Sequence, residues 1–182
     1  MTYDFTDDWF SHNIPTWQAV LPQRNIAQAL EVGSHEGRSA VWLTENVLNS
    51  KQGWQKLICI DIWEDKEIYS RFRNNTRMYE DKIRALRGNS IKTLTVLGYY
   101  HEKFDFIYVD GSHAAPDVLT DLCLAFTLLK PGGLMICDDY LGGGWDNPVE
   151  QPKMAIDAFV NCNLRRLRVL PVSGYQAFIE KI

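Results

Sequence analysis

The feature that most constrains the fold is a set of short, almost wholly apolar segments that recur along the chain. They are IAQALEVGS, KLICIDIW, FDFIYVDG and LMICDDY. Segments that are apolar at nearly every position suit strands buried on both faces, as in a parallel sheet. Segments with helical periodicity lie between them, so we predict an α/β fold with a doubly wound, mostly parallel sheet.

Helices are expected between and after these strands. We predict a short helix from Pro15, one over GRSAVWLTENVLNS with Ala40, Val41, Leu43, Val47 and Leu48 buried, and further helices over 71–79, SIKTLTVLGY, 115–130 and 153–162. The helix over 115–130 is expected to end at Pro131-Gly132-Gly133, before a strand from Leu134. A short strand is predicted over 82–86. SIKTLTVLGY also fits a strand, but its position before FDFIYVDG favours a helix.

Two further strands are predicted at the C-terminal end of the sequence, LRRLRVLPV and YQAFIEKI, joined at Ser173-Gly174. A Ser-Gly pair between two apolar runs is a hairpin signal. We therefore expect a C-terminal antiparallel hairpin at one side of the sheet. Because no repeat, low-complexity segment or linker is visible, we interpret residues 1–182 as one domain, with an aromatic N-terminal segment over 1–25 and a ligand-binding core over 26–182.

Side chains with useful chemistry lie where the predicted strands end. Gly33 and Gly37 follow the first strand, in LEVGSHEGRS, and allow the backbone to approach a ligand closely. The second strand ends at Asp61, where an acid can accept hydrogen bonds from ribose hydroxyls. The glycine spacing, E-x-G-x-x-x-G, departs from the G-x-G-x-x-G of dinucleotide sites, which makes a nicotinamide dehydrogenase the weakest interpretation. Two glycines in one turn also fit a tight turn with no ligand.

Taken in order, LEVGSHEGRS, IDIW, GNS, YVDGSH and LKPGGLMICDDY resemble the class I S-adenosylmethionine-dependent methyltransferases. The resemblance extends over roughly residues 26–182. Within the class, the sequence is most similar to the small metal-dependent O-methyltransferases, namely the catechol type and its antibiotic-pathway relatives. The resemblance implies the Rossmann-like methyltransferase fold, S-adenosylmethionine as cofactor and Mg²⁺, or Mn²⁺ or Ca²⁺, as metal.

The resemblance also implies roles for individual residues. The methionine end of the cofactor is implied to contact the loop that contains Glu31, Gly33, Ser34, His35, Gly37 and Ser39. Asp61 is implied to hold the ribose. Asn89 and Ser90 are implied to lie beside the adenine, with Ile62 and Trp63 flanking the ring. Asp110 matches a position near both cofactor and metal.

Three acids at the ends of two predicted strands match the metal ligands of this group: Asp110, Asp138 and Asp139. Carboxylate oxygens suit Mg²⁺, Mn²⁺ or Ca²⁺ better than zinc. The adjacent carboxylates of Asp138 and Asp139 would also repel each other in a dry crevice without a cation between them. The alternative is that one of them caps a turn while the other is solvated.

A catalytic base is suggested by His113, three residues beyond Asp110. The catechol-type enzymes have a lysine base at this position, so the sequence departs from that pattern. Histidine titrates near neutral pH and can accept a hydroxyl proton, which makes His113 and Asp110 the candidate catalytic residues. The alternative for His113 is a turn histidine hydrogen-bonded to a neighbouring aspartate.

Composition excludes several classes of function. The formal net charge is -4 and no basic stripe is visible, which argues against a nucleic-acid partner. No apolar run approaches the roughly 20 residues of a membrane-spanning helix, and MTYDFTDDWF carries acids where a signal peptide carries basic residues, so a cytoplasmic protein is expected. The four cysteines (Cys59, Cys123, Cys137, Cys162) are scattered, and we expect neither a zinc site nor a disulfide framework.

Three kinds of function stay open. The first is an O-methyltransferase that acts on a small hydroxylated acceptor, such as a sugar or an aromatic diol. The second is N- or O-methyl transfer without a metal, and the third is a non-catalytic S-adenosylmethionine-binding module. Trp145 is expected to contact the acceptor, whereas Trp9, Phe10 and Trp17 either cover its pocket or pack on the core. The oligomeric state is open, a homodimer being one option.

Overall fold

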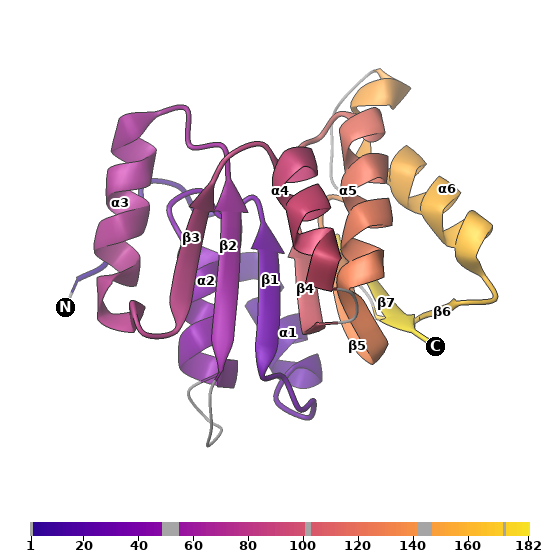
Figure 1. Cartoon of the computed structure of the whole chain (residues 1–182), viewed down its shortest axis with the longest axis horizontal. Helices are drawn as coiled ribbons and strands as arrows, with labels where there is room; N and C mark the ends of the chain where they lie inside the picture. The colour runs from indigo at the N-terminus through magenta and orange to yellow at the C-terminus, as the bar shows by residue number, and fades with distance from the viewer. Residues whose placement is uncertain (1, 49–54, 101–102, 142–146, 173) are drawn as a thin grey trace.

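The strands form one twisted sheet with helices on both faces (Figure 1). The computed structural model describes residues 2–48, 55–100, 103–141, 147–172 and 174–182. The strands are β1 (Gln28–Val32), β2 (Lys56–Asp61), β3 (Ile83–Arg87), β4 (Phe104–Val109), β5 (Leu129–Cys137), β6 (Leu167–Val169) and β7 (Ala177–Lys181). Their order in the sheet is β3-β2-β1-β4-β5-β7-β6. The pairs among β1 to β5 are parallel, and β7 is antiparallel to both β5 and β6, so the predicted sheet and hairpin are confirmed.

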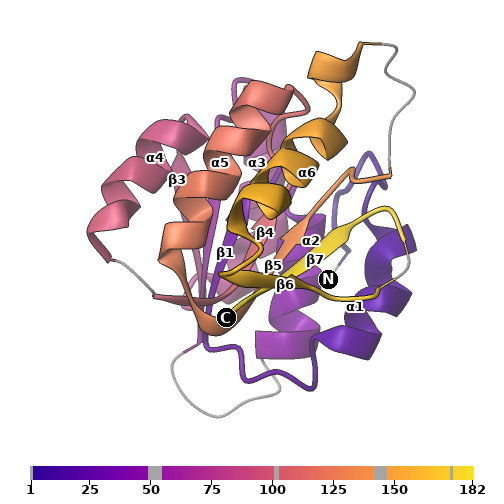
Figure 2. The same cartoon turned by 90° about the vertical axis from the view of Figure 1, so that its right-hand side faces the viewer.

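Two groups of helices sandwich the sheet. On one face lie α4 (Ser90–Leu97), α5 (Ala115–Leu128) and α6 (Pro152–Asn163), and on the other lie α1 (Ile14–Val20) and α2 (Arg38–Leu43), with α3 (Lys66–Thr76) beside β3 (Figures 1 and 2). Shorter helical turns are η1 (Ser11–Asn13), η2 (Thr44–Leu48), η3 (Arg77–Tyr79), η4 (Gly98–Tyr100) and η5 (Pro148–Glu150). In the part of the chain that the structure describes, no helix combines the length and apolar character needed to cross a membrane.

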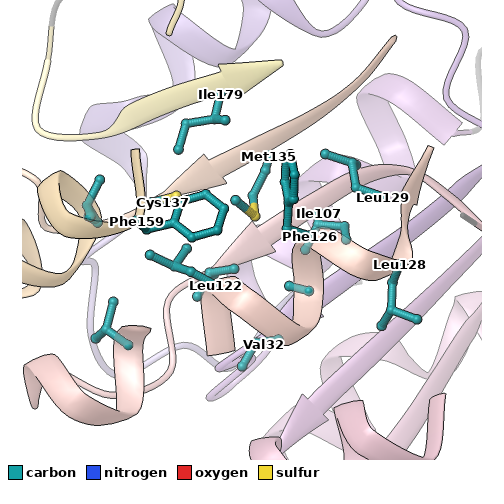
Figure 3. Packing of buried hydrophobic residues seen from close by; sticks show 14 of the residues in the cluster. Val32, Ile107, Leu122, Phe126, Leu128, Leu129, Met135, Cys137, Phe159 and Ile179 are labelled. Carbon is teal, nitrogen blue, oxygen red and sulfur yellow. The ribbon is translucent and has the colours of Figure 1, made fainter. Parts of the chain in front are cut away.

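The core has one apolar cluster on each side of the sheet. Figure 3 shows the cluster beneath α5 and α6, where the rings of Phe126 and Phe159 meet edge to face with centroids 5.3 Å apart. Burial of one such aromatic side chain contributes about 1.5–3 kcal/mol to the free energy of unfolding. On the other side, the face predicted to be buried in α2 and η2 is buried throughout: Ala40, Val41, Leu43, Val47 and Leu48.

The junction between α5 and β5 differs from the prediction. The helix ends at Leu128, and Leu129 already pairs with Phe104 in the sheet. The pairing then shifts, because Asp105 alone stands opposite residues 130–133 before Phe106 pairs with Leu134. Pro131-Gly132-Gly133 therefore forms an irregularity inside β5 and does not close the helix.

Two other boundaries are corrected. Helix α3 begins at Lys66, five residues before the predicted start, because the Asp65 carboxylate caps it by accepting a hydrogen bond from the backbone N–H of Glu67 at 2.7 Å. The final hairpin has a connection of seven residues, 170–176, between β6 and β7. The predicted Ser-Gly turn falls partly outside the described residues, because Ser173 is among the undescribed positions.

Candidate functional site

The loop after β1 lies directly against the loop after β4. Gly33 has a φ of +86°, and a Cβ atom built on it would lie 1.9 Å from the backbone oxygen of Asp110. The N–H of Gly33 donates to the Ile60 carbonyl, and the N–H of Asp110 donates to the Val32 carbonyl, each at 2.8 Å. Only glycine combines this backbone conformation with this close approach. The carboxyl ends of β1, β2 and β4 are thereby held together.

Gly33→Ala tests this contact, with Gly132→Ala as the matched control. Gly132 also has a positive φ, +76°, but a Cβ there would meet no atom within 4 Å. The control should lose about 1–2 kcal/mol, the cost of left-handed backbone in a residue with a Cβ. Gly33→Ala should lose about 1–3 kcal/mol more, because the backbone must also move. Urea unfolding of both variants measures the difference, and equal losses would contradict the close contact.

Three adjoining clefts follow the carboxyl ends of the strands. The first, about 210 Å³, is lined by Asp61, Ile62, Asn89 and Ser90, the residues expected beside ribose and adenine. The second, about 50 Å³, is lined by Ser34, His35 and Ser39, among others expected at the methionine end. The third, about 680 Å³, contains the acids and His113. Gly33 borders the first and second clefts, and Asp110 borders the second and third, so the three are neighbours along this edge of the sheet.

Asp61 is fixed by two backbone donors. Its Oδ2 accepts from the N–H of His35 at 2.8 Å, and its Oδ1 accepts from the N–H of Trp63 at 2.7 Å. Both donors have positive φ values, 43° and 41°. The carboxylate thus joins the loop after β1 to the end of β2, on the wall of the first cleft.

Trp63 does not flank this cleft, contrary to the expectation from the sequence. Its indole is 2% exposed, donates through Nε1 to the His35 carbonyl at 2.7 Å, and packs on the ring of Phe72 with centroids 4.5 Å apart. The reason is the left-handed backbone at Trp63, which turns the side chain away from the cleft and toward α3. Ile62 remains on the cleft wall and is 51% exposed.

Glu31 supports the loop after β1 from below. It is 1% exposed, and its carboxylate accepts hydrogen bonds from the hydroxyls of Ser34 and Ser39. Burial raises the pKa of Glu31 to about 6. Glu31 is not among the residues that line the three clefts, so its contacts order the loop that does line them.

A second buried acid, Asp121 of α5, was not singled out from the sequence. It is 1% exposed, neither carboxylate oxygen makes a hydrogen bond of ordinary geometry with the described residues, and the Ser90 hydroxyl opposes the rise that burial causes in its pKa. A Cβ built on Gly111, which lines the first cleft, would lie 3.7 Å from Asp121 Oδ2. The sequence did carry a signal, because Asp121 follows Val118 by three residues and precedes Ala125 by four, on the apolar face of the helix.

Asp121 should make stability depend on pH. Burial raises its pKa to about 6, well above the roughly 3.9 of an unfolded chain. The folded state therefore binds the proton more tightly, and stability falls as pH rises from about 4 to 6, by up to about 3 kcal/mol. Asp121→Asn should remove this loss, so that its advantage over the wild type grows between pH 4 and 7.5 in urea unfolding. Asp117→Asn, an exposed acid on the same helix, is the control, and a similar gain there would contradict the assignment.

The acid cluster lies at the ends of β4 and β5. The hydroxyl of Tyr108 donates toward Asp138 Oδ2 at 2.6 Å and toward Asp110 Oδ2 at 2.9 Å. Burial raises the pKa of Asp110 well above its usual range, and the nearby Asp138 carboxylate is the second cause of this rise. Burial, together with the Asp139 carboxylate, raises the pKa of Asp138. A hydroxyl has one proton and can satisfy only one of the two carboxylates at a time.

His113 lies on the open side of the cluster. Its Nε2 is 3.0 Å from Asp139 Oδ2, and this hydrogen bond raises the pKa of His113. One ligand atom from each of Asp110, His113 and Asp139 can be chosen so that all three lie within 4.8 Å of one another. Of the three predicted metal ligands, the structure brings Asp110 and Asp139 together with His113, while Asp138 shares the Tyr108 hydroxyl with Asp110. Three carboxylates gathered at two neighbouring strand ends fit a divalent cation, and their oxygens are ligands for Mg²⁺ or Mn²⁺.

The third cleft is lined by aromatic side chains as well as by the acids. Trp9 and Tyr175 line it and are 67% and 56% exposed, and His12 lies edge-on to the Tyr175 ring. Phe10 and Trp17 pack on the core, which is one of the two alternatives for the N-terminal aromatics, whereas Trp9 lines the third cleft. The sequence did not identify the places of His12 and Tyr175. Trp145, expected to contact the acceptor, lies outside the described residues.

The strand order and the site at the carboxyl ends of β1, β2 and β4 define a class I methyltransferase fold. Residues 30–140, more than half of the chain, match the family model described as a methyltransferase domain. The chain therefore belongs to the methyltransferase-domain family, as its sequence motifs predict. Among curated proteins, no significant match is found.

Solved structures of O-methyltransferases share the fold at low sequence identity. The O-methyltransferase from Bacillus cereus, in complex with S-adenosylhomocysteine, has a TM-score of 0.74 and 20% identity, over 96% of this chain and 82% of that chain. TomG from Streptomyces achromogenes, an O-methyltransferase of tomaymycin synthesis in complex with S-adenosylmethionine, has a TM-score of 0.69 and 19% identity, over 90% of this chain and 76% of that one. MycE, of the mycinamycin pathway, has a TM-score of 0.64 and 20% identity, over 98% of this chain and 50% of that one.

Proposed function

We propose that this chain transfers the methyl group of S-adenosylmethionine to a hydroxyl of a small molecule, with the help of a divalent cation. The observation that carries the proposal is the row of three neighbouring clefts, which share Gly33 and Asp110 as lining residues. The first two clefts have the side chains that suit a nucleoside and its amino-acid tail. The third has the acids, an imidazole and room for an acceptor.

The cofactor is assigned to the first two clefts. Asp61 would accept hydrogen bonds from the ribose hydroxyls, Asn89 and Ser90 would contact the adenine, and the loop over 33–39 would hold the methionine end. The complexes of the Bacillus cereus enzyme and TomG with S-adenosylhomocysteine and S-adenosylmethionine support this choice of cofactor. When bound, the cofactor supplies an electrophilic methyl group and leaves as S-adenosylhomocysteine.

The metal is assigned to the acid cluster. Asp110 and Asp139 would hold it from the two strand ends, with Asp138 as the third carboxylate. MycE, which has the same fold, binds Mg²⁺ and S-adenosylhomocysteine together with mycinamycin VI. A bound divalent cation lowers the pKa of a hydroxyl that it contacts. Because Asp110 lines both the second and the third clefts, a cation held by Asp110 and Asp139 would place the acceptor oxygen where these two clefts adjoin.

The base is assigned to His113. Its imidazole lines the acceptor cleft, and its hydrogen bond with Asp139 raises its pKa, which makes it a stronger proton acceptor. His113 would take the proton of the acceptor hydroxyl as that oxygen bonds to the methyl carbon. The positive charge formed on the imidazole would be stabilised by the Asp139 carboxylate, 3.0 Å away.

The acceptor is assigned to the third cleft, with the N-terminal segment over 1–25 as part of its wall. Trp9 and Tyr175 are large, exposed aromatic side chains that line this cleft, and such surfaces bind the faces of flat or ring-shaped molecules. The volume of about 680 Å³ fits a small molecule. Sugars and aromatic diols, which carry neighbouring hydroxyls, meet both requirements.

Calorimetric titration of S-adenosylhomocysteine, with and without Mg²⁺, tests the proposal first. The wild type should bind it. Asp61→Ala should bind at least about tenfold more weakly, because the two charge-assisted hydrogen bonds between the ribose hydroxyls and the carboxylate are lost. Asp65→Ala is the matched control, since this exposed acid lies outside the three clefts. Absence of binding by the folded wild type would refute the cofactor assignment. Binding with no methyl transfer to any hydroxylated acceptor would leave a non-catalytic binding module, and transfer independent of Mg²⁺ would leave a metal-independent methyltransferase.

His113→Ala tests the base. His12→Ala is the control, because His12 lines the same cleft and its loss should not cause the fall in kcat expected of His113→Ala. With a panel of catechols and hydroxylated sugars as acceptors, kcat of His113→Ala should fall about 10²–10⁴-fold. Affinity for S-adenosylhomocysteine should stay unchanged, since His113 does not line the first two clefts. An unchanged kcat across the pH range would exclude His113 as the base.

A further inference from the structure

A buried hydrogen-bond chain leads from helix α1 to the acid cluster. Trp17 Nε1 donates to Gln176 Oε1 at 2.7 Å, and Gln176 Nε2 donates to the Tyr108 hydroxyl at 3.4 Å. The Tyr108 hydroxyl then donates toward Asp138 and Asp110 at 2.6 and 2.9 Å. Trp17, Gln176 and Tyr108 are 0%, 3% and 1% exposed. The chain joins three parts of the fold: α1, the segment before β7, and β4.

The chemistry of the indole sets the direction of this chain. A Trp Nε1 can only donate, so it must face the carbonyl oxygen of the Gln176 amide. The NH₂ group of Gln176 is then the end that faces Tyr108, whose oxygen accepts from it. The single proton of the Tyr108 hydroxyl is therefore directed away from Gln176 and toward the carboxylates of Asp138 and Asp110.

The ring of Tyr108 is also held in place by packing. It packs edge-on against the indole of Trp17 with centroids 4.9 Å apart, within the apolar cluster on the α1 and α2 side of the sheet. Asp110 and Asp138 belong to different strand ends, yet both contact this one hydroxyl. Their relative position therefore depends on Tyr108 in addition to the backbone of β4 and β5.

We propose that Tyr108 is a positioning residue of the metal site, and that Trp17 and Gln176 fix the direction of its hydrogen bond to the acids. The proposal rests on the metal site of the proposed function. Tyr108 does not act as a ligand; it acts through Asp110 and Asp138. Donors that hold metal-binding carboxylates in place typically contribute about 10–100-fold to metal affinity. Through Trp17, helix α1 would thus contribute to the cation affinity of the acids at the carboxyl ends of β4 and β5.

Tyr108→Phe tests the proposal because it removes the hydroxyl and keeps the ring. Calorimetric titration with Mn²⁺ and with Mg²⁺ alone, without cofactor or acceptor, should show affinity about 10–100-fold weaker than in the wild type. Affinity for S-adenosylhomocysteine in the absence of metal should stay unchanged. Tyr140→Phe is the matched control, since its hydroxyl donates to Asp157 at 3.0 Å, outside the cluster, and should leave metal affinity unchanged.

Gln176→Met is a second variant, in case the tyrosine change disturbs folding. It removes the amide donor that faces Tyr108 and also interacts with Asp138, and it leaves the hydroxyl in place, so metal affinity should fall in the same direction by a smaller factor. Equal metal affinity in the wild type, Tyr108→Phe and Gln176→Met would overturn the positioning role while the metal site itself stands. A wild type that binds S-adenosylhomocysteine but neither cation would overturn both the metal assignment and this inference.

Discussion

The approach of the Gly33 backbone to the Asp110 carbonyl is the contact on which the site depends. It joins the loop after β1 to the loop after β4, and a Cβ at Gly33 would lie 1.9 Å from that oxygen. Asp61 adds a second link, because its carboxylate accepts from the N–H groups of both His35 and Trp63. Together these contacts hold the three strand ends side by side, and the neighbouring clefts lie along them.

The buried acids at the ends of β4 and β5 are unfavourable by themselves, and other parts of the structure must compensate for them. Asp110 and Asp138 share one hydroxyl donor, and the pKa of each is raised because burial disfavours its charged form. Asp139 is paired with His113 at the open side. The fold holds these like charges together through packing elsewhere, in the two apolar clusters, and a cation at the acids would relieve their repulsion. Such local cost, compensated by the rest of the structure, is typical of functional sites.

Much of the fold could be predicted because strong local signals agreed with one another. The buried runs over 28–32, 56–61 and 104–109 are strands, and the apolar face of α2 and η2 is buried as expected. The errors occurred where non-local pairing overrides local patterns. Pro131-Gly132-Gly133 resembles a helix stop, but pairing of Leu129 with Phe104 draws it into β5. The direction of the Trp63 side chain depends on a left-handed backbone angle that composition does not reveal.

The sequence by itself determined the order of strands and helices and the family, because these follow from periodicity and from motifs at strand ends. It also identified the acids and His113 as the chemical groups of interest. Only the tertiary structure decided how they group. Asp139 lies with His113, Asp138 with Tyr108, and Tyr108 connects through Gln176 to Trp17, 91 residues earlier in the chain. The physical reason is that hydrogen bonds and burial join side chains from separate elements, which are neighbours only once the sheet has formed.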